Sequence, residues 1–131
     1  MTKFNIKIFI TIIFIAFSMI FASFAQAHEL IQLKFAKGKT TKTVSDAVLR
    51  EETTTYLVNA KRGQKMSVKI TSVEKNAVFT IKTPSGDFVA NAGEMDDQTN
   101  WKGVLPENGN YQIEVAPTRG NTTYRMTVSV K

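Results

Sequence analysis

Residues 65–71 read Lys-Met-Ser-Val-Lys-Ile-Thr, and this short stretch sets the fold class of the whole chain. Its apolar side chains, Met66, Val68 and Ile70, occupy every second position. Successive side chains of a β-strand point to opposite faces of a sheet, so this spacing is typical of a strand with one face in a core and the other in water. We therefore predict a half-buried strand here.

The same alternation of apolar and polar residues recurs along the chain after residue 30. The other alternating runs lie at residues 31–35, 56–60, 79–81, 111–115 and 124–130. Clusters rich in Gly, Pro and Asn separate many of them, and no segment shows a sustained helical period. Short strands that each have one face to bury fold as two packed sheets. We predict an all-β fold, an antiparallel two-sheet β-sandwich of about eight or nine short strands.

Residues 1–27 have a different composition from the rest. They hold six of the nine Phe and no acidic residue, and two lysines precede a fifteen-residue, almost wholly apolar run at 8–22. Small residues then frame Ala25 and Ala27, which is the order of a secretory signal peptide. An uncleaved membrane anchor is less favoured, because a span needs about 20 apolar residues. We predict cleavage after Ala25 or Ala27, a single domain at 28–131, and a periplasmic or secreted protein with no membrane association after cleavage.

The inventory of reactive side chains argues against an enzyme. The chain has no Cys, so it lacks disulfides, thiolate metal sites and a cysteine nucleophile. The sole histidine, His28, lies at the predicted new N-terminus, where no packed relay could orient it. The acidic group Glu94, Asp96 and Asp97 lacks the alternating pattern of a calcium loop and is interpreted as solvated. We predict no catalytic residue, no metal and no cofactor.

Basic residues and one tryptophan each leave two interpretations open. Cations cluster at 34–42 and 61–65, either as a solvated surface or as a surface attracting an acidic protein or anionic envelope polymers. Nucleic acid is not expected, because most aromatic residues fall in inward register and export argues against it. Trp101 is either a core residue at one end of the sandwich or an exposed platform for sugar.

Arg119 stands out because of its setting. It lies at the crest of the turn predicted at 117–121, where a sandwich has no use for a guanidinium in its core. Arg is enriched among the residues that dominate binding at protein interfaces, and a turn on rigid strands loses little entropy when it binds. The alternative is a solvated turn residue.

Four blocks of sequence carry a family resemblance. They read YLVNAKRGQKMSV at 56–68, TPSG at 83–86, LPENGNYQI at 105–113 and YRMTV at 124–128. In this order the blocks resemble the bacterial pre-peptidase C-terminal-like β-sandwich. Together with FAKG at 35–38 and Thr118-Arg119 after Val115, they look like the periplasmic inhibitors of goose-type (g-type) lysozyme.

The resemblance implies a non-enzymatic protein whose loops at one end of the sandwich plug the cleft of a g-type lysozyme. We expect the protein to be a monomer. Arg119 matches the position of the inserted cation. The candidate partner-binding residues are Arg119, Thr118, Gly120, Arg50 and Asn108. The alternative function is a sugar- or peptidoglycan-binding envelope module without inhibitory activity.

Overall fold

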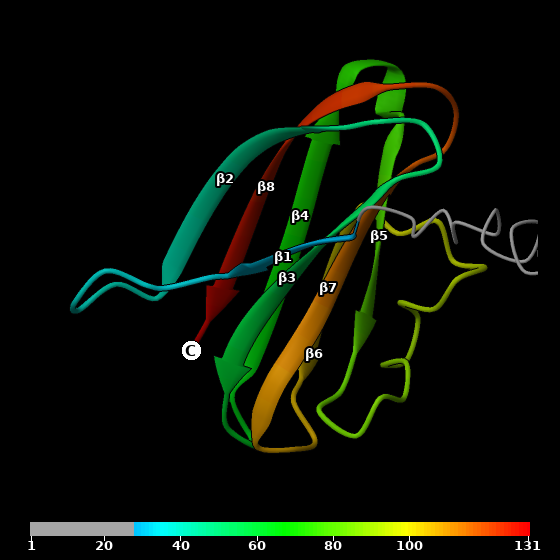
Figure 1. Cartoon of the computed structure of the whole chain (residues 1–131). Helices are drawn as coiled ribbons and strands as arrows, with labels where there is room; N and C mark the ends of the chain where they lie inside the picture. The colour runs from blue at the N-terminus through cyan, green and yellow to red at the C-terminus, as the bar shows by residue number, and fades with distance from the viewer. Residues whose placement is uncertain (1–27) are drawn as a thin grey trace, which may run out of the picture.

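A computed structural model of the chain describes residues 28–131, so the predicted signal peptide lies outside the described residues (Figure 1). Eight strands and one 3-10 turn follow one another along the chain. They are β1 (His28–Gln32), β2 (Thr41–Val48), β3 (Thr53–Ala60), β4 (Lys65–Ser72), η1 (Val73–Lys75), β5 (Ala77–Lys82), β6 (Asn100–Val104), β7 (Gly109–Pro117) and β8 (Thr122–Val130). Within this described part, no helix is long and apolar enough to cross a membrane.

The strands form two four-stranded sheets, ordered β1-β3-β7-β5 and β2-β8-β4-β6, which pack face to face. The predicted two-sheet sandwich is confirmed. One strand departs from the antiparallel pattern, because β1 pairs with β3 in parallel. The chain leaves β1, forms β2 in the other sheet and returns as β3, so that β1 and β3 start at the same end (Figure 1).

β2 and β6 do not show the regular alternation of buried and exposed side chains. β2 is exposed along almost its whole length, and only Val48 at its end is buried. It is held instead by its pairing with β8 and by hydroxyl contacts such as Thr43 Oγ1 to Thr127 Oγ1 at 3.0 Å. β6 is short and carries Trp101 as its one buried side chain. Neither strand has the regular apolar spacing that marks β4 or β8.

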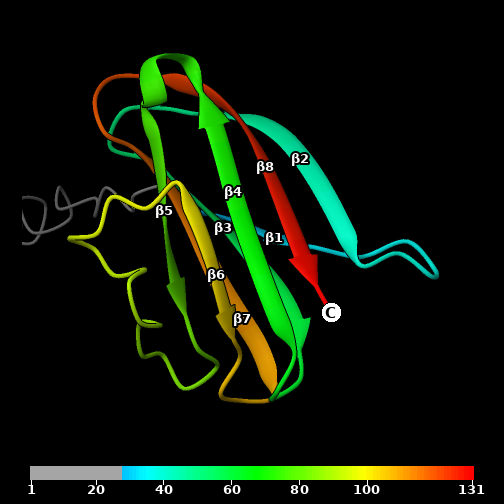
Figure 2. The ribbon, with the colours of Figure 1, turned by 180° about the vertical axis from the view of Figure 1, so that it is seen from behind.

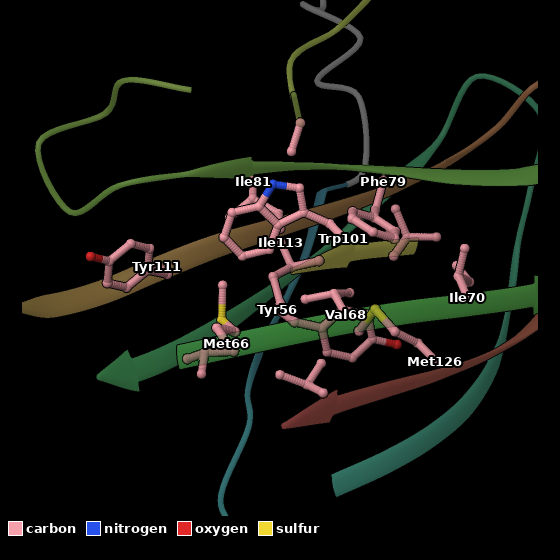
Figure 3. Close-up of a cluster of buried hydrophobic side chains, with 14 of the residues drawn as sticks. Tyr56, Met66, Val68, Ile70, Phe79, Ile81, Trp101, Tyr111, Ile113 and Met126 are labelled. Carbon is pink, nitrogen blue, oxygen red and sulfur yellow. The ribbon is translucent and has the colours of Figure 1, made fainter. Parts of the chain in front are cut away.

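The core lies between the sheets and is rich in aromatic and branched side chains (Figure 3). Trp101 belongs to it with 8% of its surface exposed, and its indole N–H donates to the carbonyl oxygen of Ala90 at 2.9 Å. The ring lies over Gly103, where an added Cβ would come within 2.5 Å of Trp101 Cζ2. The glycine in β6 is thus explained by the tryptophan two residues earlier.

Two tyrosines join the sheets through the core. Tyr56 on β3 and Tyr124 on β8 are buried, their rings meet edge to face with centroids 6.5 Å apart, and their hydroxyl groups are hydrogen-bonded to each other. Burial, and for Tyr56 also the hydrogen bond to Tyr124, raises the pKa of both phenols. The folded protein therefore holds both groups neutral, because a phenolate in this core would lose its hydration.

We predict that the free energy of unfolding falls at alkaline pH and that Tyr56→Phe reduces this fall. The folded pKa lies above the unfolded value of about 10, so the stabilisation is complete below pH ~10 and is lost as the pH rises beyond it. Urea unfolding at about pH 8 and pH 11 measures the loss for both proteins. Because the two proteins differ only at residue 56, the difference between their losses isolates the contribution of the Tyr56 hydroxyl group. An equal loss in the variant contradicts this assignment.

Candidate partner-binding site

Three connections between the sheets gather at one end of the sandwich. They are the β2–β3 turn (residues 49–52), the β4–β5 turn containing η1 (residues 73–76) and the β7–β8 turn (residues 118–121). The antiparallel registers bring them together, because Thr122 opposes Val48 and Pro117 opposes Ala77. All three lie at the top of Figure 1. We call this end the three-turn end.

Arg119 presents its guanidinium at this end. Its side chain is 74% exposed, and Nη2 lies 3.3 Å from Oε2 of Glu74, itself 73% exposed. An ion pair between two such exposed groups contributes little, about 0–1 kcal/mol, because water screens it and both side chains lose freedom. The guanidinium is therefore available to a partner whose carboxylate is less screened by water than that of Glu74.

The backbone beneath Arg119 is held far more firmly than its side chain. Asn76 is buried, and its Oδ1 accepts from the Arg119 N–H at 2.8 Å and from the Thr118 hydroxyl, while its Nδ2 donates to the Arg119 carbonyl oxygen. The Thr118 N–H donates to the Asn76 carbonyl oxygen at 2.9 Å. One asparagine thus fixes both polar groups of the Arg119 backbone. The sequence gives no sign of this contact, because a lone Asn in a turn does not reveal a partner more than 40 residues away.

Arg50 joins the same site from the β2–β3 turn. Its N–H donates to Oδ1 of Asn121 at 2.8 Å, which ties this turn to the β7–β8 turn. A hollow of about 450 Å³ lies between the two turns. Its lining residues are Arg50, Glu51, Pro117, Thr118, Arg119 and Gly120. The structure therefore brings together four of the five residues selected from the sequence.

Asn108, the fifth residue, lies at the opposite end. It precedes β7, whereas Arg119 follows it, and its Oδ1 accepts from the Arg62 N–H at 2.8 Å in the β3–β4 turn. Asn108 itself lies in the β6–β7 turn, which the Tyr111 hydroxyl closes by donating to the Glu107 carbonyl oxygen at 2.7 Å. Asn108 therefore joins two turns at the other end of the sandwich and does not share a surface with Arg119.

The three-turn end also concentrates unusual backbone and exposed apolar groups. Glu51, Glu74 and Lys75 have φ of 63°, 54° and 54°, a region that costs a non-glycine residue free energy and often marks functional sites. Leu49 and Val73, in two of the same turns, leave 48% and 69% of their surface exposed. A pair of arginines beside apolar side chains on constrained turns is suited to docking a protein.

A larger hollow of about 680 Å³ borders the 83–91 segment and β6, away from Arg119. It offers no free aromatic platform. Trp101 is buried with its N–H engaged, and the Lys82 ammonium lies 5.0 Å from the centre of the half-exposed Phe88 ring. The interpretation of Trp101 as an exposed sugar platform is therefore wrong. Its interpretation as a core residue is confirmed, but it lies opposite Val68 in the middle of β4 and not at one end of the sandwich.

The described residues contain no group of three or more His, Cys, Asp or Glu side chains that could hold a metal ion. In the acidic segment at 94–97, Asp96 instead uses Oδ2 to accept from the Gly93 N–H at 2.7 Å. This carboxylate thus stabilises a turn of its own loop.

No protein-family model matches the sequence, and no curated protein matches it either. Solved structures do resemble it. PliG from Aeromonas hydrophila, a periplasmic inhibitor of g-type lysozyme, shares 27% identity over 82% of this chain and 100% of its own, with a TM-score of 0.70. A mutant of PliG from Escherichia coli shares 26% identity over 80% of this chain and 100% of its own, with a TM-score of 0.64.

The pre-peptidase C-terminal domain of a Bacillus anthracis collagenase shares the fold. It is 16% identical over 82% of this chain and 97% of its own, with a TM-score of 0.54. Both resemblances drawn from the sequence blocks are thus confirmed in structure. The two PliG proteins described above, which share more than a quarter of their aligned residues with this chain, are inhibitors.

We predict that Asn76→Ala lowers the free energy of unfolding by about 1–3 kcal/mol, because it leaves the Thr118 and Arg119 groups without partners in a half-buried setting. Urea unfolding followed by Trp101 fluorescence measures the change. Asn59→Ala is the matched control, since its Nδ2 makes one exposed hydrogen bond to Asn110, and a loss below about 1 kcal/mol is expected. Equal losses in both variants contradict the role given to Asn76.

Proposed function

We propose that this chain is an exported inhibitor of a g-type lysozyme and that its three-turn end occupies the substrate cleft of the enzyme. Two PliG inhibitors resemble the chain at 26–27% identity over their whole length, which supports the partner. The observation that carries the mechanism is the exposed Arg119 guanidinium on a turn held by Asn76. The predicted signal peptide at 1–27 would place the protein in the same compartment as a wall-lytic enzyme.

Charge supports this mode of binding. Glycosidases cleave with carboxyl groups at the base of a cleft, and one of them usually acts as an acid with a raised pKa. A guanidinium inserted beside such a group makes charge-assisted hydrogen bonds that strengthen when water is excluded. Arg119 extends from the crest of its turn, and Arg50 on the neighbouring turn adds a second cation.

The rigidity of the turns that carry Arg119 and Arg50 also supports this mode of binding. Binding costs free energy for every segment that must become ordered, and a loop fixed in advance avoids most of that cost. The Arg119 backbone is already held by Asn76, and the Arg50 backbone by Asn121. The exposed Leu49 and Val73 beside them provide apolar contact around the cations. A tight plug of this kind buries about 800 Å² on each partner.

We predict that Arg119→Ala weakens inhibition of a g-type lysozyme by about 2 kcal/mol or more, as expected of a residue at the centre of an interface. The assay is the lysis of a cell-wall suspension at increasing ratios of purified protein to enzyme. Arg62→Ala is the matched control, because it removes the same charge from an exposed residue at the opposite end and should leave inhibition unchanged.

Two results contradict the proposal. If the unaltered protein in molar excess does not suppress lysis, the chain is not an inhibitor of that enzyme class. If Arg119→Ala and Arg62→Ala weaken inhibition equally, the effect comes from net charge, and the three-turn end is not the docking surface.

We further predict that Glu74→Gln tightens binding by up to about fivefold at low salt. The substitution frees the Arg119 guanidinium from an exposed pair worth at most about 1 kcal/mol and removes a carboxylate that would face an acidic cleft. Isothermal titration calorimetry at low and high salt measures it, and the gain should shrink as salt rises. Glu94→Gln, in an exposed loop outside the three-turn end, is the control. Weaker binding by Glu74→Gln would mean that the pair positions Arg119 for its partner.

A further inference from the structure

The outer side of the β2-β8-β4-β6 sheet carries cations and hydroxyl groups and no carboxylate. Figure 2 views the molecule from this side. We call this surface the hydroxyl-cation face. Its residues are Thr41, Thr43, Ser45 and Ala47 on β2, Thr123, Arg125, Thr127 and Ser129 on β8, Lys65, Ser67, Lys69 and Thr71 on β4, and Asn100, Lys102 and Val104 on β6.

Strand geometry fixes the direction of these side chains. Met66, Val68 and Ile70 on β4 are buried, so the residues between them point outward. Trp101 is buried beside Lys102, and Tyr124 and Met126 are buried on either side of Arg125. The cations of the face are therefore held outward by the same alternation that builds the core.

The four cations of the face account for the whole net charge of the domain. Residues 28–131 carry 15 basic and 11 acidic side chains. Setting aside Lys65, Lys69, Lys102 and Arg125 leaves eleven of each sign on the rest of the domain. None of the four forms an ion pair with a carboxylate of the described residues, and all four are exposed. The outer side of the other sheet, by contrast, has Glu114 in the middle of β7.

The hydroxyl groups form rows across the strands. Thr41 lies opposite Ser129, Ser129 opposite Ser67, and Ser67 opposite Lys102, so one row crosses all four strands. The next row runs from Thr43 through Thr127 to Lys69. Neighbouring strands lie about 4.8 Å apart, and outward side chains repeat about every 6.7 Å along a strand. The result is a flat array of donors and acceptors with fixed positive charges.

The composition of this face discriminates between classes of anionic partner. No aromatic side chain points outward from it, so it lacks the stacking groups that single-stranded nucleic acid needs. Val104 is its one large apolar residue, which is too little for insertion into a membrane or for the apolar centre of a protein interface. An extended polymer that combines carboxylates with many hydroxyl groups matches both the cations and the hydroxyl rows.

We propose that the hydroxyl-cation face binds an acidic polysaccharide. A hollow of about 580 Å³ at one end of the face, between β4, β6 and β8, offers a starting point for one acidic sugar. It is lined in part by Lys65, Ser67, Lys102 and Ser129 together with Lys131. This proposal does not depend on lysozyme inhibition, because the face and the three-turn end are different surfaces.

The test uses polygalacturonate as the acidic probe and dextran as the neutral one, with the purified protein in calorimetry at low ionic strength. We expect binding to polygalacturonate, weakened by added salt, and none to dextran. The triple variant Lys69→Ser, Lys102→Ser, Arg125→Ser should bind at least about tenfold more weakly. The control triple Lys37→Ser, Lys39→Ser, Arg62→Ser removes the same three charges from exposed turns and should stay within about twofold.

Circular dichroism and thermal melting establish that both triple variants are folded. If the first is not, Lys102→Ser and Arg125→Ser are measured singly, and each should weaken binding about threefold. Absence of binding by the unaltered protein overturns the proposal, as does an equal loss in both triple variants. Tighter binding to single-stranded DNA or to anionic vesicles than to polygalacturonate also overturns it. Lysozyme inhibition by the first triple variant, assayed in parallel, should be unchanged.

Discussion

The burial of the two inner sheet faces against each other is the constraint on which the rest of this protein depends. Strands with one apolar face have no stable arrangement alone, and the sandwich satisfies all of them at once. The Tyr56–Tyr124 contact joins the sheets within that core. Packed sheets lie about 10 Å apart, so every connection between them has to cross over the edge of the core. Three such crossings occur at the end that carries Arg119.

These crossings explain why rigidity and exposure coexist at Arg119. A segment crossing the end of a core leaves its strand ladder, and its backbone groups need other partners. Asn76 and Asn121 provide them for the turns that hold Arg119 and Arg50. The backbone is thereby fixed from within while the side chains remain in water. The exposed ion pair with Glu74 is too weak to retain the guanidinium.

The alternation of residues predicted the sandwich and its core, because burial of one strand face leaves a direct trace in sequence. β2 does not show this alternation, because it has no buried face and is held by hydroxyl contacts and backbone pairing with β8.

The candidate site was predictable only in part. Turn residues can be recognised locally, but the end of the sandwich at which each turn lies depends on strand direction. Asn108 and Arg119 flank the same strand and are therefore at opposite ends. The role of Asn76 depends on a contact distant in sequence.

The hydroxyl-cation face and the three-turn end differ in how their charge is distributed. Eleven positive and eleven negative side chains balance over the domain outside the hydroxyl-cation face, so long-range attraction to a polyanion is centred on the flat side of one sheet. The role proposed for Arg119 is different, because a single guanidinium partly neutralised by Glu74 attracts a partner only at contact, where water is excluded. A polymer lying along β4 and β8 leaves the turns at the strand ends uncovered. The two proposed activities, retention on an acidic polymer and insertion into an enzyme cleft, are therefore compatible in one small sandwich, since each would use a surface that the other leaves free.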